Sequence, residues 1–94
     1  MRKLAWTPKS IRVFKRLIRK NPQLRSPIEK TLQQLVDDPF HPSLKTQKLM
    51  GDLSKVWSCS VDYSYRILFE FVKDSESDSE NVLLLNIGSH DEVY

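Results

Sequence analysis

Residues 57–72 read WSCSVDYSYRILFEFV, and this stretch carries the clearest strand signal of the chain. Trp57 and Cys59 alternate with serines, which is the two-residue period of a β-strand. From Tyr65 to Val72 the residues are mostly aromatic and aliphatic, a composition typical of a strand. The Asp-Tyr-Ser sequence at residues 62–64 has the composition of a turn. The stretch therefore predicts two strands joined by a turn.

Further strands are predicted on both sides of this stretch. Residues 82–87 form a nearly continuous apolar run, which is typical of a central strand covered on both faces. Residues 73–81 are acidic and rich in serine, so we expect a solvated connection there. Residues 3–6 can form a short opening strand. Residues 40–54 are expected to form a loop with a short strand near residues 48–50.

Two helices are predicted between the opening strand and this loop. Thr7 is an N-cap candidate, and after it apolar residues recur on one helical face until an Asn-Pro pair at 21–22 ends the helix. Ser26 is the N-cap candidate of the second helix, and Glu29 is expected to reach back to it as a capping box. The two helices are expected to run antiparallel over residues 8–37.

The order of these elements indicates the fold class. One strand and two helices are followed by at least three strands, which indicates an α+β fold with the helices on one face of the sheet. The other face is then left partly open, and a binding surface can form there. A chain of 94 residues has the length of a single domain, which we expect to span residues 1–94.

Charge is unevenly distributed along the chain. Residues 1–55 contain 13 lysines and arginines against 4 aspartates and glutamates, whereas residues 56–94 contain 2 against 8. A basic N-terminal half suggests an anionic partner, such as nucleic acid or an acidic protein. A pair of solvated helices that are rich in lysine and arginine explains the same pattern equally well.

The sequence also bears on location. No apolar run is long enough to cross a bilayer, and the first residues are too poor in apolar side chains for a secretory signal. Cys59 is the single cysteine, so no intrachain disulfide can form, and we expect it to be a small buried apolar residue. We therefore expect a cytoplasmic protein without a membrane partner.

The residue types present exclude several kinds of site and favour one. The sequence has no metal-binding motif, no glycine-rich phosphate loop and no nucleophile elbow. What remains is a set of cationic, imidazole and aromatic side chains, namely Lys45, Lys48, Arg66, His90 and Tyr94. This set suits cleavage of RNA by its own 2′-hydroxyl, which requires an acid, a base and cations that stabilise the phosphate charge. No metal or cofactor is needed, because the nucleophile comes with the substrate.

Each of these residues also has a purely structural interpretation. An unpaired charge inside an apolar strand is costly, so Arg66 either pairs with a carboxylate or faces the open side of the sheet and binds an anion. Glu70 and Asp62 are the carboxylates within reach in the sequence. For the other four candidates the alternative is a solvated side chain or, at the C-terminus, a frayed one.

Several motifs resemble those of RelE/ParE-superfamily toxins. Residues 42–57, PSLKTQKLMGDLSKVW, are similar to the family's loop before a strand, and residues 65–69, YRILF, to the strand that follows. The opening, with LAWTPK at residues 4–9, fits as well. Residues 83–94, LLLNIGSHDEVY, look like the ending of the RelE and YafQ-like mRNA interferases. The resemblance implies a curved, antiparallel-rich sheet with two N-terminal helices packed on one face.

The resemblance implies a toxin of a type II toxin–antitoxin system, with a cognate antitoxin as its protein partner. The mRNA-cleaving members act in the A site of the 30S ribosomal subunit. In that branch Arg66 matches the strand arginine on the scissile phosphate, His90 the C-terminal acid or base, and Tyr94 the aromatic residue that stacks on the substrate. Lys45 and Lys48 match the basic residues of the loop, which would bind the substrate.

Two positions depart from the YafQ-like pattern. Some of those enzymes carry a second histidine and an aspartate beside the strand turn, where this chain has Ser60 and Ser64. A second acid or base is therefore not assigned: either a lysine, Asp91 or Tyr94 takes its place, or catalysis is weak. ParE-type proteins share the fold, lack the ribonuclease residues and inhibit DNA gyrase, which is the alternative function. An interaction module without toxicity is a third hypothesis, whereas His90 together with Tyr94 favours the ribonuclease.

Overall fold

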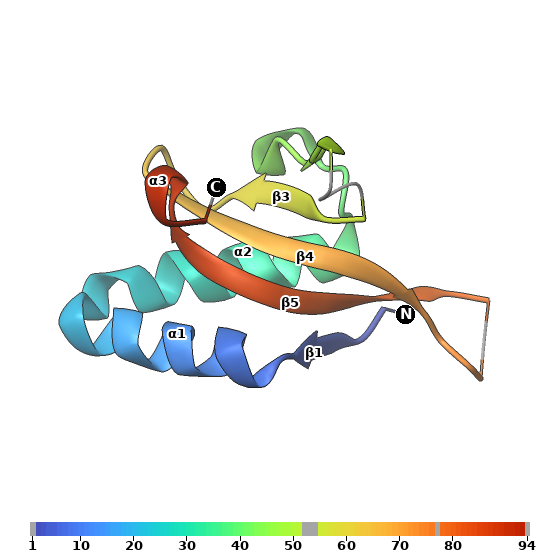
Figure 1. Cartoon of the computed structure of the whole chain (residues 1–94), viewed down its shortest axis with the longest axis horizontal. Helices are drawn as coiled ribbons and strands as arrows, with labels where there is room; N and C mark the ends of the chain where they lie inside the picture. The colour runs from blue at the N-terminus through green and yellow to red at the C-terminus, as the bar shows by residue number, and fades with distance from the viewer. Residues whose placement is uncertain (1, 52–54, 77, 94) are drawn as a thin grey trace.

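The computed structural model describes residues 2–51, 55–76 and 78–93, which form a curved five-stranded mixed sheet with helices (Figure 1). The strands are β1 (Leu4–Trp6), β2 (Gln47–Lys48), β3 (Trp57–Ser60), β4 (Tyr65–Lys73) and β5 (Glu80–Ser89). The helices are α1 (Pro8–Lys20), α2 (Arg25–Asp37) and α3 (His90–Val93), and the 3₁₀ helices are η1 (Pro22–Leu24) and η2 (Pro42–Leu44). Among these residues no helix has both the length and the apolar character needed to span a membrane. The predicted α+β class is confirmed.

The strand order in the sheet is β1-β5-β4-β3-β2. β1 pairs with β5 in parallel, and the other neighbouring strands pair antiparallel. β5 therefore lies inside the sheet between β1 and β4, as its continuous apolar run predicts. The short strand expected near residues 48–50 is present as β2, slightly earlier in the chain.

The hairpin of β4 and β5 is longer than the sequence predicts. The connection expected over residues 73–81 shortens to residues 74–79, because the two strands continue pairing at their far ends. The Asp74 amide donates to the Ser79 carbonyl at 3.0 Å, next to the end of the ladder. Polar residues here join the sheet through hydrogen bonds of their backbone groups. A prediction based on the polarity of side chains does not detect this pairing.

α1 begins where the sequence predicts, at an N-cap formed by Thr7. Thr7 Oγ1 accepts a hydrogen bond from the Ser10 amide at 3.1 Å and donates one to the Leu84 carbonyl of β5 at 2.9 Å. The Ser10 hydroxyl donates in turn to the Thr7 carbonyl at 2.9 Å. Because one hydroxyl satisfies both a helix amide and a strand carbonyl, it fixes the start of α1 against the sheet.

α2 begins differently from the prediction. It starts at Arg25 rather than after Ser26, and η1 runs directly into it, with Leu24 in right-handed helical conformation. Glu29 does not form the expected capping box, because its Oε1 accepts a hydrogen bond from Arg25 Nε at 2.7 Å. The preceding helical turn places Ser26 inside the helix, where a capping role is lost. The predicted cap is therefore wrong, although the helix itself is present.

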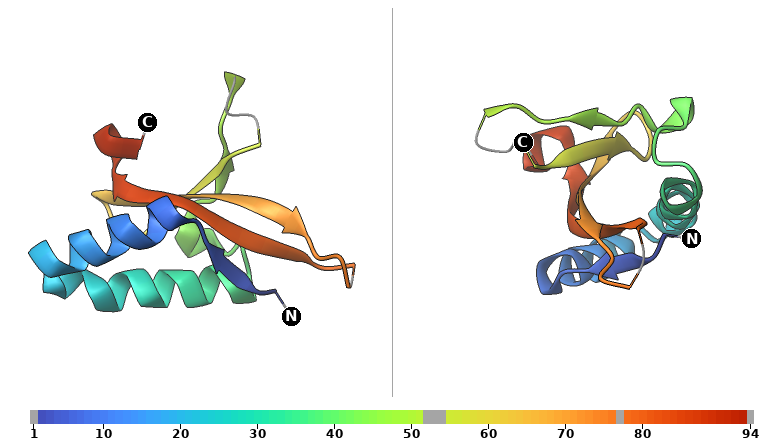
Figure 2. Two further views of the ribbon diagram at one scale, coloured as in Figure 1. Left: turned by 60° about the horizontal axis from the view of Figure 1, so that its bottom comes forward. Right: turned by 90° about the vertical axis from the view of Figure 1, so that its right-hand side faces the viewer.

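The core lies between α2 and the sheet. Ile28 and Leu35 of α2 are fully buried, as are Phe69 of β4 and Leu84 of β5. α1 packs against this core through partly buried apolar residues, Val13, Phe14 and Leu17. Both long helices cover the same side of the sheet, which we call the helix face (Figure 2). The prediction of two helices on one face is confirmed.

The opposite side of the sheet, which we call the outer face, is more covered than expected. Ser58 of β3 is fully buried and Leu68 of β4 is only 7 % exposed.

A register shift between Leu68 and Phe69 leaves Leu85 without a direct partner in the ladder and forms a β-bulge. Because a bulge bends its strand and increases the local twist, it contributes to the curvature of the sheet.

Truncation of Phe69 tests how much stability the core provides. Phe69→Ala removes a fully buried ring from the sheet, and we expect the free energy of unfolding to fall by about 3–5 kcal/mol. Val72→Ala is the control on the same strand, because Val72 is 42 % exposed and its loss should cost about 0.5 kcal/mol or less. Urea unfolding followed by circular dichroism measures both variants, and equal losses would contradict this packing.

Candidate functional site

A row of three residues crosses the outer face near the end of β5. Arg66 of β4 pairs with Ser60 of β3 on one side and with Gly88 of β5 on the other. Directly paired residues point to the same face of a sheet. The neighbouring row of Cys59, Ile67 and Ile87 is part of the buried core, so these side chains point to the helix face. Arg66 and Ser60 consequently project from the outer face.

The guanidinium of Arg66 is held by a hydroxyl group rather than by a carboxylate. Arg66 Nη1 donates to Ser60 Oγ at 2.8 Å, and within residues 2–51, 55–76 and 78–93 Arg66 forms no salt bridge. Of the carboxylates considered from the sequence, Asp62 instead accepts hydrogen bonds from the Ser64 and Tyr65 amides, both at 2.8 Å. Those bonds confirm the predicted turn at 62–64. The arrangement favours the interpretation of Arg66 as an anion-binding cation.

Cys59 lies beneath this arginine on the helix face. It is fully buried, and burial raises the pKa of its thiol to about 12 even though the positive charge of Arg66 lowers it. The thiol is therefore protonated at neutral pH and is a poor nucleophile. The expectation that Cys59 is a buried apolar residue is confirmed.

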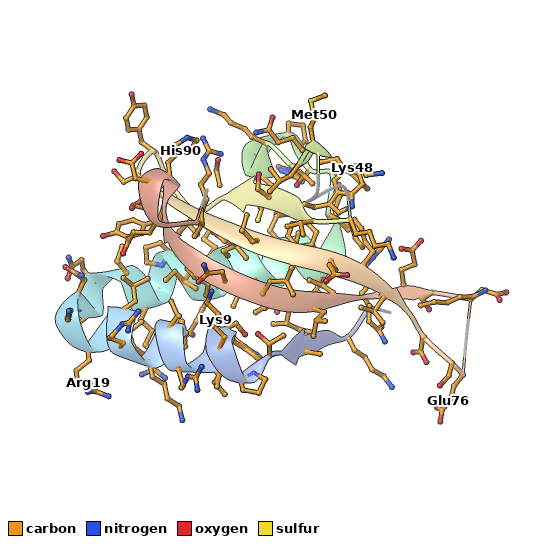
Figure 3. All side chains as sticks on the ribbon, in the orientation of Figure 1. Lys9, Arg19, Lys48, Met50, Glu76 and His90 are labelled. Atoms are coloured by element: carbon orange, nitrogen blue, oxygen red, sulfur yellow. The ribbon has the colours of Figure 1, made fainter. Side chains whose placement is uncertain are left out.

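A capping box fixes the turn that carries His90. The Ser89 amide donates to Glu92 Oε1 at 3.0 Å, and the Glu92 amide donates to Ser89 Oγ at 3.4 Å. His90 is the first residue of α3, immediately after β5 (Figure 3). The signal was readable in the sequence, because Ser-His-Asp-Glu at residues 89–92 has the spacing of a capping box. Our prediction did not identify α3.

Gly88 allows α3 to fold back over the outer face. A Cβ atom at Gly88 would lie 3.2 Å from both Glu92 Cβ and Val93 Cγ1, closer than side chains normally approach. Because Gly88 is the cross-strand partner of Arg66, α3 packs on the face from which Arg66 projects. The fold therefore brings Arg66 and the His90 turn to the same end of the same face.

Positive charge from α1 also reaches this end of the sheet. The hydrogen bonds with the Ser89 amide and hydroxyl, followed by the charges of Arg16 and Lys20, hold the pKa of Glu92 below its usual range. α1 carries a run of cations and no acidic residue, its basic side chains being Lys9, Arg12, Lys15, Arg16, Arg19 and Lys20 (Figure 3). Much of the excess positive charge of the N-terminal half is thus concentrated on α1.

The predicted substrate lysines are not brought to Arg66. Lys48 pairs with Trp57, and its Nζ lies 6.0 Å from the centre of the Trp57 ring. Trp57 shares the helix face with Cys59, two residues along the strand, so Lys48 and Arg66 leave the sheet on opposite faces. Lys45 ends η2 in a left-handed conformation and is exposed.

The other predicted positions are placed only in part. Tyr94 lies outside the described residues. Ser60 holds Arg66, and the Ser64 amide holds the turn, so these positions have structural roles. In the described part of the chain, no group of three or more histidine, cysteine, aspartate or glutamate side chains could hold a metal ion. The chemistry available at this end of the sheet is that of a guanidinium and an imidazole.

A protein-family model matches most of the chain. Residues 4–94 match the model of the ParE toxin of type II toxin–antitoxin systems. None of the curated protein sequences that were compared matches the chain.

Several solved structures have the same fold at low sequence identity. A YoeB/ParE toxin from Agrobacterium tumefaciens is 19 % identical, with a TM-score of 0.78 over 94 % of this chain and 98 % of that chain. YafQ from E. coli is 11 % identical, with a TM-score of 0.78 over 100 % of this chain and 99 % of that chain. The E. coli DinJ–YafQ toxin–antitoxin complex matches at 13 % identity and a TM-score of 0.76, over 99 % and 97 % of the two chains.

The capping box can be tested through the ionisation of Glu92. Because the pKa of Glu92 is lowered, its charged carboxylate caps α3 at and above the ordinary glutamate pKa, and the cap is lost as pH falls through the lowered value. We expect the Ser89 amide resonance to titrate below the ordinary glutamate range in ¹H–¹⁵N spectra. Glu92→Gln should abolish this titration. An inflection at or above the ordinary value would contradict the arrangement.

Proposed function

The chain belongs to the ParE toxin family of type II toxin–antitoxin systems, and we propose that it is an endoribonuclease that cuts mRNA in the A site of the ribosome. The observation that carries this proposal is the position of Arg66. Its guanidinium has a hydroxyl partner instead of a carboxylate, and it projects on the face where the His90 turn is packed. A cation that is ordered but not neutralised is suited to bind a phosphodiester.

The reaction we propose uses the 2′-hydroxyl of the RNA as its nucleophile. The 2′-oxygen attacks the adjacent phosphorus, the bond from phosphorus to the 5′-oxygen breaks, and the products carry a 2′,3′-cyclic phosphate and a 5′-hydroxyl. The 2′-hydroxyl loses a proton and the leaving oxygen gains one, so the step is balanced without water, metal or cofactor. The protein must hold the phosphate in line, stabilise its growing negative charge and assist proton transfer.

Arg66 is the residue that we assign to the phosphate. Its planar guanidinium can donate two parallel hydrogen bonds to phosphate oxygens while Nη1 remains bonded to Ser60. The Ser60 hydroxyl restricts the rotation of the guanidinium, which reduces the entropy lost when the phosphate binds. Ser60 is therefore a positioning residue for Arg66.

His90 is the residue that we assign to proton transfer. Its place at the start of α3 is fixed by the capping box of Ser89 and Glu92 and by the close packing of α3 over Gly88. The imidazole of histidine is the side chain that most often serves as a general acid or base. We retain Tyr94 as the aromatic residue that stacks on the substrate, and a second acid or base is not assigned.

Partners and location follow from the proposed reaction. Lys45 and Lys48 are proposed to contact the mRNA backbone away from the scissile phosphate, because Lys48 projects from the helix face. A cognate antitoxin is the expected protein partner, as DinJ is for YafQ in the E. coli toxin–antitoxin complex. Because the proposed substrate is mRNA on ribosomes, we propose that the protein acts in the cytoplasm.

Two substitutions test the assignment of the site. His90→Ala removes the proton-transfer group and should slow cleavage of ribosome-bound mRNA by about 10²–10⁴-fold. Arg66→Ala should slow it by a comparable factor, because charge stabilisation at the phosphate is lost. Mapping of mRNA 5′ ends on ribosomes incubated with each variant measures the rate. Lys73→Ala, at the far end of β4 from Gly88, is the control and should cut at the wild-type rate.

The same preparations distinguish the ribonuclease from a gyrase inhibitor. We expect no inhibition of DNA supercoiling by pure protein under conditions in which mRNA is cut. Inhibition of gyrase without mRNA cleavage, or wild-type cleavage by the His90→Ala variant, would remove the proposal.

A further inference from the structure

A pocket of about 400 Å³ lies at the opposite end of β5 from α3. It is separate from the row of Ser60, Arg66 and Gly88, none of which lines it. Its apolar part consists of three aromatic rings and its cationic part of three basic side chains, namely Phe40, Trp57, Phe71, Arg2, Lys48 and Lys55. Two carboxylates, Glu70 and Glu80, complete the lining.

The aromatic rings form a preorganised surface with one exposed member. Trp57 meets Phe40 and Phe71 edge to face, with ring centres 5.5 Å apart in both pairs. These contacts hold Phe40 in place even though it is 57 % exposed. Exposure of a large apolar ring to water is unfavourable, and a planar ligand that stacks on it would remove that cost. Bases of unpaired nucleotides bind proteins in this way.

The basic side chains around the rings leave positive charge available to a ligand. Lys48 Nζ lies 6.0 Å from the centre of the Trp57 ring. Arg2 Nε is buried and has no hydrogen-bond partner among the described residues. A buried donor without a partner costs free energy, which an anionic ligand in the pocket can recover. Arg2 thus supplies an observation, independent of the aromatic rings, that points to a ligand.

We propose that this pocket binds an unpaired nucleotide. The base stacks on Phe40, and the phosphate lies between Lys48, Lys55 and Arg2. Glu70 and Glu80 accept hydrogen bonds from amino or hydroxyl groups of the nucleotide. The cations that surround the rings favour this ligand over an apolar peptide, which would leave them unpaired. The nucleotide is either part of a single-stranded RNA or a free mononucleotide, since both offer the same groups.

Nucleotide binding in this pocket is a property distinct from mRNA cleavage, and the two can be measured separately. A role in holding mRNA outside the scissile site rests on the proposed ribonuclease function, whereas nucleotide binding in the pocket does not. Lys48 would then bind the nucleotide in this pocket, on the face of the sheet opposite to Arg66.

Fluorescence of Trp57 provides a direct test. The chain has two tryptophans, Trp6 and Trp57, and Trp6→Phe leaves Trp57 as the single reporter. This protein is titrated, without ribosomes, with a 2′-O-methyl RNA hexamer that cannot be cut, with adenosine 5′-monophosphate, and with ribose 5-phosphate. We expect saturable quenching by the hexamer or by both nucleotide ligands, and none by ribose 5-phosphate because it lacks a base.

Variants show whether the quenching comes from the pocket. Phe40→Ala should weaken binding about tenfold or more, and Lys55→Ala should weaken it and lower the salt dependence for the hexamer by about one phosphate contact. Lys55 is exposed, so this variant tests the pocket even if Phe40→Ala fails to fold. Lys30→Ala on α2 is the matched control, because it removes the same charge away from the pocket.

The outcomes separate this proposal from the ribonuclease assignment. Quenching by the hexamer alone identifies an RNA segment, and equal quenching by the mononucleotide identifies a free nucleotide. No quenching by either, or quenching that Phe40→Ala and Lys55→Ala leave unchanged, overturns the proposal. His90→Ala should bind normally, so wild-type cleavage by this variant together with intact binding contradicts only the ribonuclease assignment.

Discussion

The antiparallel pairing of β4 with β5 is the constraint on which the candidate site depends. Its register places Arg66 opposite Gly88. Because Gly88 has no side chain, α3 can pack closely over it. A shift of one residue would turn Arg66 into the core between the sheet and the helices and would place Ile67 in solvent. The same hydrogen-bond ladder that buries the core therefore also orients the cation and brings the His90 turn to it.

The helix face of the sheet provides stability, whereas the outer face carries the candidate site. The helix face buries Ile67 and Phe69 against α2, which offsets the cost of keeping a guanidinium on the other side of the same strand. On the outer face the Ser60 hydroxyl orders Arg66 without neutralising it. A carboxylate in that position would stabilise the arginine more strongly and would compete with a phosphate for it. The departure from the YafQ-like pattern at Ser60 thus has a structural consequence.

Much of the fold could be predicted from local patterns, and the errors have physical causes. The strands from Trp57 onward and the Thr7 cap depend on residues close in sequence, and they were predicted. The Ser26 cap was wrong because η1 continues into α2, which the residue types did not indicate. The face of Lys48 depends on the register of a two-residue strand in a loop without periodicity, so no sequence pattern could assign it. Arg66 and His90 were predicted individually, but their relation required α3.

In the reaction that we propose, Arg66 holds a phosphate while the 2′-hydroxyl of the RNA attacks it. The most direct measurement changes one atom of the substrate and leaves the protein untouched. An mRNA with a single 2′-deoxynucleotide on the 5′ side of the scissile bond is placed on the ribosome, and the products are analysed by mass spectrometry. We predict that cleavage at that bond disappears, whereas the unmodified mRNA yields a 2′,3′-cyclic phosphate. Undiminished cleavage of the modified bond would contradict the account.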